Sequence, residues 1–130
     1  MNKSESQAYI DKMYEERGRS FSFDFHQVLA AEDLDFLKAY NQMIEACYID
    51  RRILDNKTKE IIYMVALTSV KASVEQIQAH VKLAVALGAT KHEILEALEI
   101  CLPIAGVPAF MIGFEAWKRV VSPDKVEPTH

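Results

Sequence analysis

Residues 54–88 read LDNKTKEIIYMVALTSVKASVEQIQAHVKLAVALG, and this stretch decides the fold. Its apolar residues recur at three- and four-residue spacings, which is the pattern of a helix face, and the pattern breaks once. The spacing predicts one helix over residues 56–70 and a second over residues 74–87. Helices joined by so short a connection pack antiparallel, so this pair is the predicted centre of the fold.

Residues that start and stop helices support these bounds. Asp55 and Ser73 stand where N-caps are needed, and Gly88 follows the second helix as a C-terminal stop. Thr90 and Glu93 then have the spacing of a capping box, in which a hydroxyl and a carboxylate each pair with an unsatisfied backbone N–H. A third helix is therefore predicted to begin directly after this turn.

The rest of the chain shows further helical patterns on both sides of this region. The predicted segments are a helix from Ser4 to Arg17, an arm over residues 19–27, a helix from Glu32 to Tyr48, a helix from residue 91 to Cys101 interrupted at Pro103, and a helix from Pro108 to Val121. In the arm, Phe21, Phe23 and Phe25 alternate with polar residues. We expect an extended segment whose rings dock on another helix or another subunit.

These elements predict an all-α, single-domain bundle of about six helices. Residues 1–53 supply N-terminal helices and the aromatic arm, residues 54–121 supply the core of the same compact domain, and residues 122–130 form a disordered tail. Apolar residues of the first central helix cover more than half of its surface, which is more than one partner face hides. We therefore expect a homo-oligomer.

Composition narrows the class of protein. The chain has 130 residues and a net charge of −4 with both signs interspersed, so no basic stripe predicts nucleic-acid binding. The longest uncharged run, residues 100–114, contains two prolines and is too short to span a bilayer. The polar N-terminus lacks the apolar core of a signal peptide, so we expect a cytoplasmic protein without membrane contact.

The two cysteines show neither metal-ligand spacing nor a CxxC motif. Cys47 and Cys101 both lie in apolar segments, and in a reducing compartment two buried thiols are expected. The alternative is a reactive or disulfide-forming pair.

His80 is the best candidate for a functional side chain. It shares the apolar face of its helix with Ile77, Val81 and Ala84, and Gln76 lies one turn earlier on the same face. One interpretation is a core histidine whose polar atoms are satisfied by a neighbour. The other is a proton donor or acceptor in a pocket, because imidazole titrates near neutral pH.

Four short segments follow one another in this region: Leu54–Ile62 (LDNKTKEII), Ala79–Lys82 (AHVK), Leu87–Ile94 (LGATKHEI) and Gly106–Ala109 (GVPA). Their order resembles the carboxymuconolactone decarboxylase-like superfamily, whose domain opens on LDxKTRELI, keeps a histidine on the next helix, and continues with an AGAT turn and a GxPA segment. The resemblance covers about half of the chain.

The resemblance implies two possible chemistries. The alkylhydroperoxidase branch carries a CxxC motif before the histidine, and here those positions are Ser73 and Gln76, or Ala72 and Glu75 after a shift of one residue. Without a thiolate there is no nucleophile for a peroxide. The decarboxylase branch lacks the CxxC motif and keeps the histidine, so the chain resembles that branch more closely.

The decarboxylase resemblance implies a lyase that removes carbon dioxide from a small carboxylated lactone or a related enolisable acid, with no cofactor and no metal. His80 would donate the proton, and Glu60 would set its protonation state. Glu60 could instead be a first-turn acid that stabilises the helix dipole.

Four further residues are candidates for substrate binding. Arg51 and Arg52 could grip a carboxylate, although loop arginines are commonly solvated. Ser73 could bind substrate or cap its helix, and Gln76 could cap that helix or orient His80. The expected partners are a small anionic organic substrate and other copies of the chain, in the trimers or hexamers that the resemblance implies.

Two other functions are possible on the same residues. A non-catalytic member of the family would bind a small ligand or serve in assembly. A thiol peroxidase would have to use Cys47 or Cys101 outside the family pattern.

Overall fold

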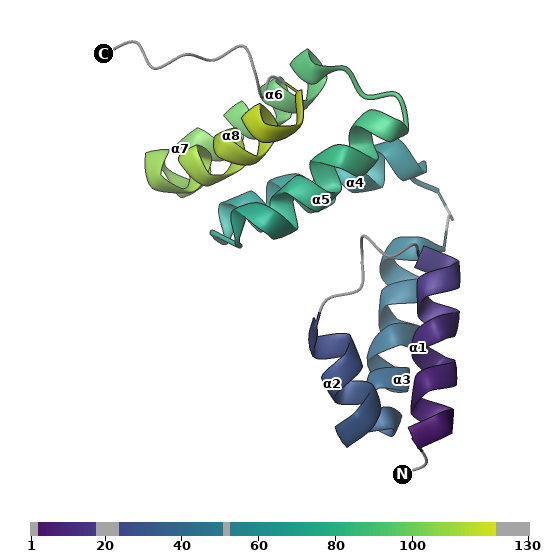
Figure 1. The fold of residues 1–130 in the computed structure, drawn as a ribbon. Helices are drawn as coiled ribbons and strands as arrows, with labels where there is room; N and C mark the ends of the chain where they lie inside the picture. Colours follow the sequence, from purple (N-terminus) through teal and green to yellow (C-terminus); the bar gives the residue numbers. More distant parts are fainter. Residues whose placement is uncertain (1–2, 18–23, 51–52, 122–130) are drawn as a thin grey trace. The chain divides into compact units, whose positions relative to one another are not determined.

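A computed structural model describes residues 3–17, 24–50 and 53–121, and all regular secondary structure in them is helical (Figure 1). The helices are α1 (Lys3–Arg17), α2 (Asp24–Glu32), α3 (Leu34–Ile44), a π-helical turn (Glu45–Ile49), α4 (Asn56–Ser69), α5 (Val74–Ala86), α6 (Lys91–Glu99), α7 (Cys101–Ala105) and α8 (Val107–Val121). The prediction of an all-α protein is confirmed. The predicted tail and two rings of the arm, Phe21 and Phe23, lie outside the described residues.

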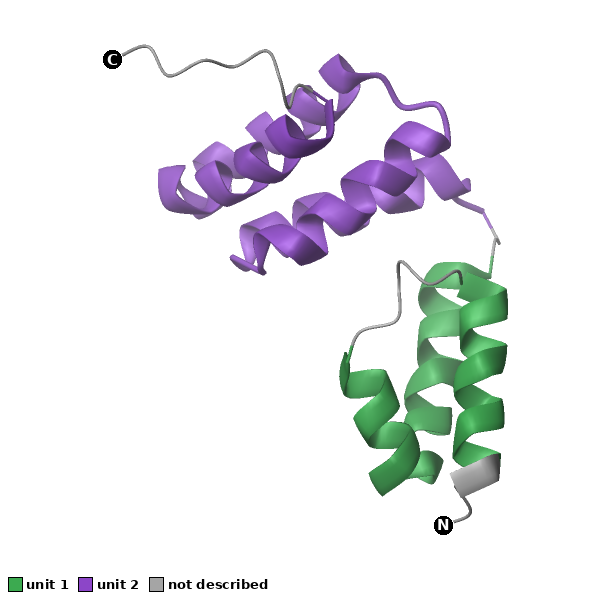
Figure 2. Ribbon diagram, in the orientation of Figure 1, with its two compact units in different colours: residues 1–51 green, residues 52–130 purple. Residues whose placement is uncertain are grey.

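The helices gather into two compact units, residues 1–51 and residues 52–130 (Figure 2). Among the described helices, none has both the length and the apolar composition needed to cross a bilayer.

The second unit is built on α4 and α5, which lie side by side (Figure 1). α8 packs against both of them, and α6 packs against α8. The shared core contains mainly aliphatic side chains that are almost fully buried: Met64, Ile77, Val81, Ala84, Ala89, Ile94, Leu98, Ala116 and Trp117. The face of α5 predicted from residue spacing is thus the face that packs into this core.

Two turns of the same kind terminate α4 and α5. After α4, the N–H of Ala72 donates to the Leu67 carbonyl and the N–H of Lys71 to the Thr68 carbonyl, the paired bonds of a Schellman motif. After α5, Gly88 and the residue that follows it repeat this pattern. The motif needs a left-handed residue, with φ of 101° at Gly88 and 59° at Lys71. The first turn reverses the chain and lets α5 run back along α4.

The first unit packs α1 and α3 against α2 around a smaller core. Ile10 and Met13 from α1, Ala30 from α2, and Leu34 and Leu37 from α3 are all buried there. This core is what holds the three helices together.

The prediction of an extended arm over residues 19–27 is wrong for residues 24–27, which the structure describes. Phe25 belongs to α2, and its ring meets that of Tyr40 edge-on, with 5.7 Å between the centroids. The contact of this ring with another helix agrees with the prediction, but the backbone here is helical and not extended. The segment 24–32 is rich in alanine and other helix-forming residues, and this propensity outweighs the alternation of the phenylalanines.

The expectation of two buried thiols is also wrong for one of them. Cys101 is buried, whereas Cys47 is exposed in the π-helical turn that follows α3. The buried face of α3 continues from Leu37 to Asn41 and does not include Cys47. An i→i+5 turn changes the rotation per residue, so a face extrapolated at 3.6 residues per turn no longer holds beyond it.

Candidate functional site

The N-terminal half of α4 positions the first candidate, Glu60. Asp55 caps the helix by accepting a hydrogen bond of 2.8 Å from the Thr58 N–H, as the sequence predicted. Glu60 is therefore the fifth residue of α4 and lies beyond its first turn, which contains no acidic residue. The alternative of a first-turn acid near the helix dipole does not fit this position. The carboxylate is instead turned inward, and the residue is only 7 % exposed.

His80 lies halfway along α5 and is the partner of this carboxylate. Its Nδ1 atom is 2.8 Å from Oε1 of Glu60, and His80 is 5 % exposed. The two residues are 20 positions apart in sequence, and the reversal of the chain after α4 brings them together. The structure thus joins the two residues predicted as a catalytic pair.

Tyr63 is the third member of this cluster, and our sequence analysis did not identify it. Its ring stacks on the His80 imidazole with 4.4 Å between the ring centroids and 23° between the planes. A signal was present in the sequence, because residues three positions apart share a helix face. Tyr63 follows Glu60 at that spacing and so reaches the same neighbour on α5.

Ser73 and Gln76 form the N-terminal cap of α5. The Ser73 hydroxyl oxygen accepts from the Gln76 N–H at 3.2 Å, and the hydroxyl lies 3.4 Å from the Gln76 side-chain oxygen. Both residues are exposed. The capping interpretation of Ser73 is therefore correct, and the side chain of Gln76 meets Ser73 rather than His80.

The other candidates for binding substrate are placed less directly. Arg51 and Arg52 lie outside the described residues. Another cationic residue, Lys71, is exposed in the turn after α4. Among the described residues, no group of three or more histidine, cysteine or acidic side chains has the arrangement of a metal site.

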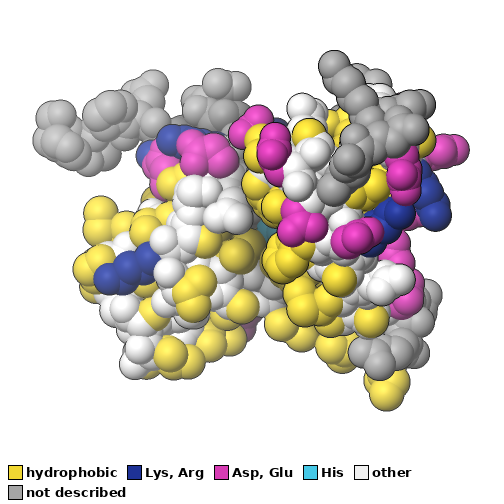
Figure 3. Space-filling view, turned by 90° about the horizontal axis from the view of Figure 1, so that it is seen from below, with side chains coloured by type: hydrophobic (Ala, Val, Ile, Leu, Met, Phe, Trp, Pro, Cys, Tyr) yellow, Lys and Arg dark blue, Asp and Glu magenta, His cyan; other side chains and the backbone are white. Residues whose placement is uncertain are grey.

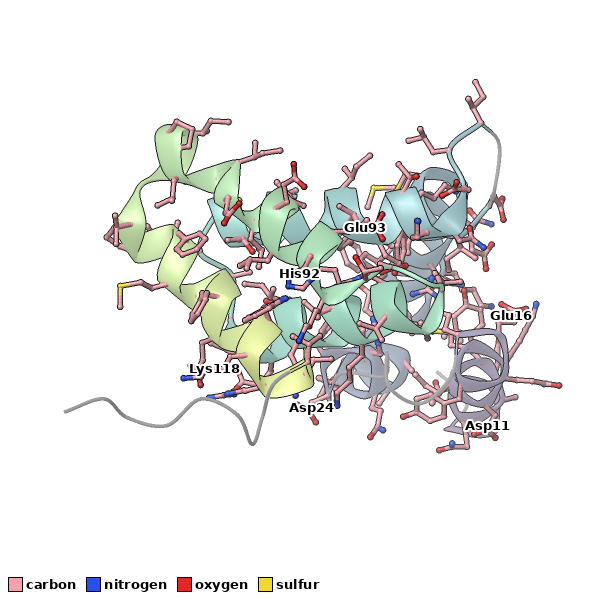
Figure 4. All side chains as sticks on the ribbon, turned by 90° about the horizontal axis from the view of Figure 1, so that it is seen from above. Asp11, Glu16, Asp24, His92, Glu93 and Lys118 are labelled. Atoms are coloured by element: carbon pink, nitrogen blue, oxygen red, sulfur yellow. The ribbon has the colours of Figure 1, made fainter. Side chains whose placement is uncertain are left out.

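A second cap lies at the start of α6. Thr90 and Glu93 form the predicted capping box at the start of α6, where Figure 4 labels Glu93. The pKa of Glu93 is lowered, chiefly because the Thr90 backbone N–H donates to its carboxylate and secondly because Lys57 is nearby. The Nζ atom of Lys57 is 3.5 Å from Oε2 of Glu93, so this ion pair links the first turn of α4 to the first turn of α6.

The Glu60–His80 pair is suited to proton transfer. An ionised carboxylate only accepts hydrogen bonds, so beside an ionised Glu60 the Nδ1 atom of His80 must carry a hydrogen. Buried histidine–carboxylate pairs of this geometry orient and charge a general acid or base in many enzymes.

The chain matches the model of a known protein family. The carboxymuconolactone decarboxylase family matches residues 35–119, about two thirds of the chain, so the protein belongs to that family. The match begins in α3, well before the Leu54 motif at which the resemblance was expected to start. None of the curated proteins compared with the chain matches it.

Proposed function

We propose that the protein is a cofactor-independent lyase that decarboxylates a small carboxylated lactone or a related enolisable acid. The observation that supports this most directly is the 2.8 Å contact between His80 Nδ1 and Glu60 Oε1 inside the second unit. Membership of the carboxymuconolactone decarboxylase family supports the proposed reaction class. The proposal assigns the proton transfer to His80 and the control of its charge to Glu60.

The chemistry needs little beyond this pair. When the bond to the carboxylate breaks, carbon dioxide leaves and its electron pair moves into the conjugated carbonyl of the substrate, which gives an enolate. The imidazolium of His80 then donates a proton to carbon, and the neutral ring regains a proton from water. Glu60 favours the charged ring before transfer, and each turnover consumes one proton overall.

The substrate is an anion, so the proposal also requires cationic groups. We assign this role to Arg51 and Arg52, which precede α4 in the sequence. A guanidinium binds a carboxylate through two parallel hydrogen bonds and so orients as well as attracts it. We assign further substrate contacts to Ser73 and Gln76 at the N-terminus of α5, in addition to their capping role.

A second candidate function is a small-ligand binding or assembly protein without catalysis. The burial of His80, which is 5 % exposed, favours this alternative, because a buried histidine paired with a carboxylate can be purely structural. A thiol peroxidase has less support. Cys101 is buried with its sulfur 3.7 Å from the Val65 carbonyl, and serine and glutamine occupy the positions of the family's CxxC motif.

We also propose that the protein works as a homo-oligomer, a trimer or hexamer. Hydrophobic side chains are exposed on the surface of the described residues (Figure 3). Several of them lie between the end of α6 and the first half of α8: Ile100, Leu102, Ile104, Val107 and Met111. The sequence from residue 100 to 114 has no charged residue, so an equally apolar surface is the fitting partner, and a second copy supplies one.

Turnover of candidate acids tests the proposed function. Wild-type protein is incubated with carboxymuconolactone and with related lactones that carry a carboxylate, and the carbon dioxide released is measured. We expect release from at least one of them in buffer without added cofactor. Binding of these acids, seen as a rise in melting temperature, without any release of carbon dioxide would instead support the binding protein. For scale, a ligand at 100 times its Kd adds about 2.7 kcal/mol of stability.

A further inference from the structure

The first unit contains a small cavity between α1 and α3, which lie side by side (Figure 1). Tyr9 and Met13 line it from α1, Asn41 lines it from α3, and Glu45 lines it from the π-helical turn that follows. Its volume is about 180 Å³. Pockets for drug-sized ligands have volumes of ~300–1,000 Å³, so this cavity admits only a small molecule.

The most buried residues of the lining are Met13 and Asn41, each 4 % exposed. An amide buried at this level needs hydrogen-bond partners. Asn41 Nδ2 donates to the Tyr9 hydroxyl oxygen at 3.0 Å and to Oε1 of Glu45 at 3.1 Å, and Asn41 Oδ1 accepts from Arg17. This network fixes the amide and holds the Tyr9 hydroxyl and the Glu45 carboxylate beside it.

Tyr9 and Glu45 can each make a further hydrogen bond. The Tyr9 oxygen accepts from Asn41, so its own hydrogen can be donated to a ligand, and a carboxylate has acceptor sites beyond the one that Asn41 uses. Both oxygens lie within 3.1 Å of the same nitrogen, so they are at most about 6 Å apart. The cavity therefore presents a hydrogen-bond donor and a carboxylate a short distance from each other.

Charged side chains of both signs complete the lining. Lys12 and Lys38 supply two positive charges, and Glu16 and Glu45 supply two negative ones. Lys38 places its Nζ atom 5.7 Å from the centre of the Tyr9 ring, so one positive charge lies beside the hydroxyl donor. Lys38 also pairs with Glu5 at 3.4 Å, but both side chains are substantially exposed and such pairs are weak. A lining with balanced charges favours a ligand that carries both signs.

The backbone at Glu45 is unusual as well. Glu45 begins the π-helical turn Glu45–Ile49, and its carbonyl accepts from the Asp50 N–H at 2.7 Å. Turns of this kind are rare and frequently lie at functional sites. The turn is a second observation that points to the end of α3.

We propose that this cavity binds a small free α-amino acid as its zwitterion. The ammonium group donates to the Glu45 carboxylate, and the carboxylate accepts from the Tyr9 hydroxyl and from Lys38. Both groups of an α-amino acid are attached to one carbon, which suits a donor and an acceptor at most about 6 Å apart. The side chain of the amino acid lies against Met13. The site is in the first unit, whereas Glu60 and His80 belong to the second, so this inference does not depend on the proposed lyase.

A panel of amino acids tests the chemical class of the ligand. Thermal unfolding of the full chain is measured with each common amino acid in turn, at about 10 mM, because a compound that binds the folded state raises the melting temperature. We expect a rise with at least one small member. Its N-acetyl form lacks the ammonium group and its amide lacks the carboxylate, so each should bind about tenfold more weakly or worse. No rise with any amino acid, or equal binding of the N-acetyl form, would overturn the proposal.

Variants test whether binding occurs in this cavity. Glu45→Gln keeps an oxygen that can accept from Asn41 but removes the charge, so we expect titration calorimetry to show about tenfold weaker binding of the amino acid that gave the largest rise. Tyr9→Phe removes only the hydroxyl and should weaken binding about threefold or more. Glu15→Gln, an equal change at an exposed position of α1 outside the cavity, should bind as wild type does.

Melting temperatures of the variants without amino acid show which of them are folded. Should Glu45→Gln fail to fold, Tyr9→Phe decides the question. Wild-type affinity in every folded variant of Glu45 and Tyr9 would place the bound amino acid elsewhere and would contradict the assignment.

Discussion

Glu60 and His80 show what the sequence reveals about single residues. The spacing of apolar residues placed His80 on the buried face of its helix, and the structure agrees. Periodicity alone did not pair it with Glu60, because a pattern within one helix carries no information on its partner across a turn. The pairing came from the family resemblance. Tyr63 was missed because an aromatic residue in an apolar helix has the same pattern whether it packs in a core or stacks on an imidazole.

His26 gives a prediction on the pH dependence of stability. Burial, and to a lesser extent the Arg17 guanidinium, lower its pKa below the ordinary value. The His26 side chain of the unfolded chain then binds a proton more readily than that of the folded chain. The contribution of neutral His26 to stability is therefore fully present above a pH of about 6.5 and is lost as the pH falls toward the lowered pKa. We expect wild type to lose more stability than His26→Gln between pH 7 and pH 5.

Thermal unfolding of both proteins across this range measures the difference. Subtracting the two series removes the titration of the other histidines, which both proteins share. A difference in melting temperature that stays constant with pH would show that His26 does not couple to folding.

At the scale of elements, the sequence predicted helix ends best where side chains bond to nearby backbone. Each of three N-cap side chains accepts a hydrogen bond from the backbone N–H three residues further along the chain: Asp55, Ser73 and Thr90. The signal for such a cap is therefore contained in four consecutive residues. Gly88 closes its helix as expected for a residue with positive φ. Helix α2 was not predicted, because the helix propensity of residues 24–32 outweighs the alternation of the phenylalanines. The π-helical turn was not predicted, because a pattern read at 3.6 residues per turn does not anticipate an i→i+5 turn.

Gly113 provides a test of how the helices of the second unit pack. A Cβ atom built on Gly113 would lie 2.7 Å from both side-chain branches of Thr68 and 2.8 Å from Leu98. Alanine in place of glycine normally stabilises a helix, by ~0.5–1 kcal/mol. Here we expect the opposite sign, a loss of ~1–3 kcal/mol, because overpacking forces buried side chains to move. Chemical denaturation of Gly113→Ala measures the change.

A double variant is the control for this explanation. Thr68→Ala removes both branches that the new methyl group would meet, and the Thr68 hydroxyl has no hydrogen-bond partner among the described residues. Gly113→Ala should therefore cost less in the Thr68→Ala background than in wild type. Equal costs in the two backgrounds would mean that the close approach to Thr68 does not set the penalty.

At the scale of the molecule, apolar surface points to association with other copies. The sequence predicted self-association because the residues of α4 are apolar around much of the helix. In the structure, the residues from Ile100 to Met111 include several exposed hydrophobic side chains. We expect light scattering in dilute buffer to give at least twice the chain mass of 14.8 kDa. The number of copies did not follow from the sequence pattern, since it depends on the angle between surfaces rather than on their polarity.

A charged substitution within this group of exposed hydrophobic residues tests whether the copies meet there. Ile104 is 77 % exposed, so Ile104→Glu should leave the fold intact and lower the mass toward one chain. Gln42→Glu adds the same charge at an exposed polar position and should keep the wild-type mass. A wild-type protein that stays monomeric at micromolar concentration would disprove self-association, and an unchanged mass of Ile104→Glu would place the contact elsewhere.

The central claim is that His80 transfers a proton, and turnover by His80→Gln tests it most directly. Wild type and variant are compared for release of carbon dioxide from carboxymuconolactone, or from the acid that wild type turns over best, with melting temperature and mass measured on the same samples. Glutamine is polar and of similar length, so we expect the fold and mass to be kept while kcat falls by ~10²–10⁴-fold. A His80→Gln protein that melts well below wild type, and whose folded fraction turns over at the wild-type rate, would contradict the claim.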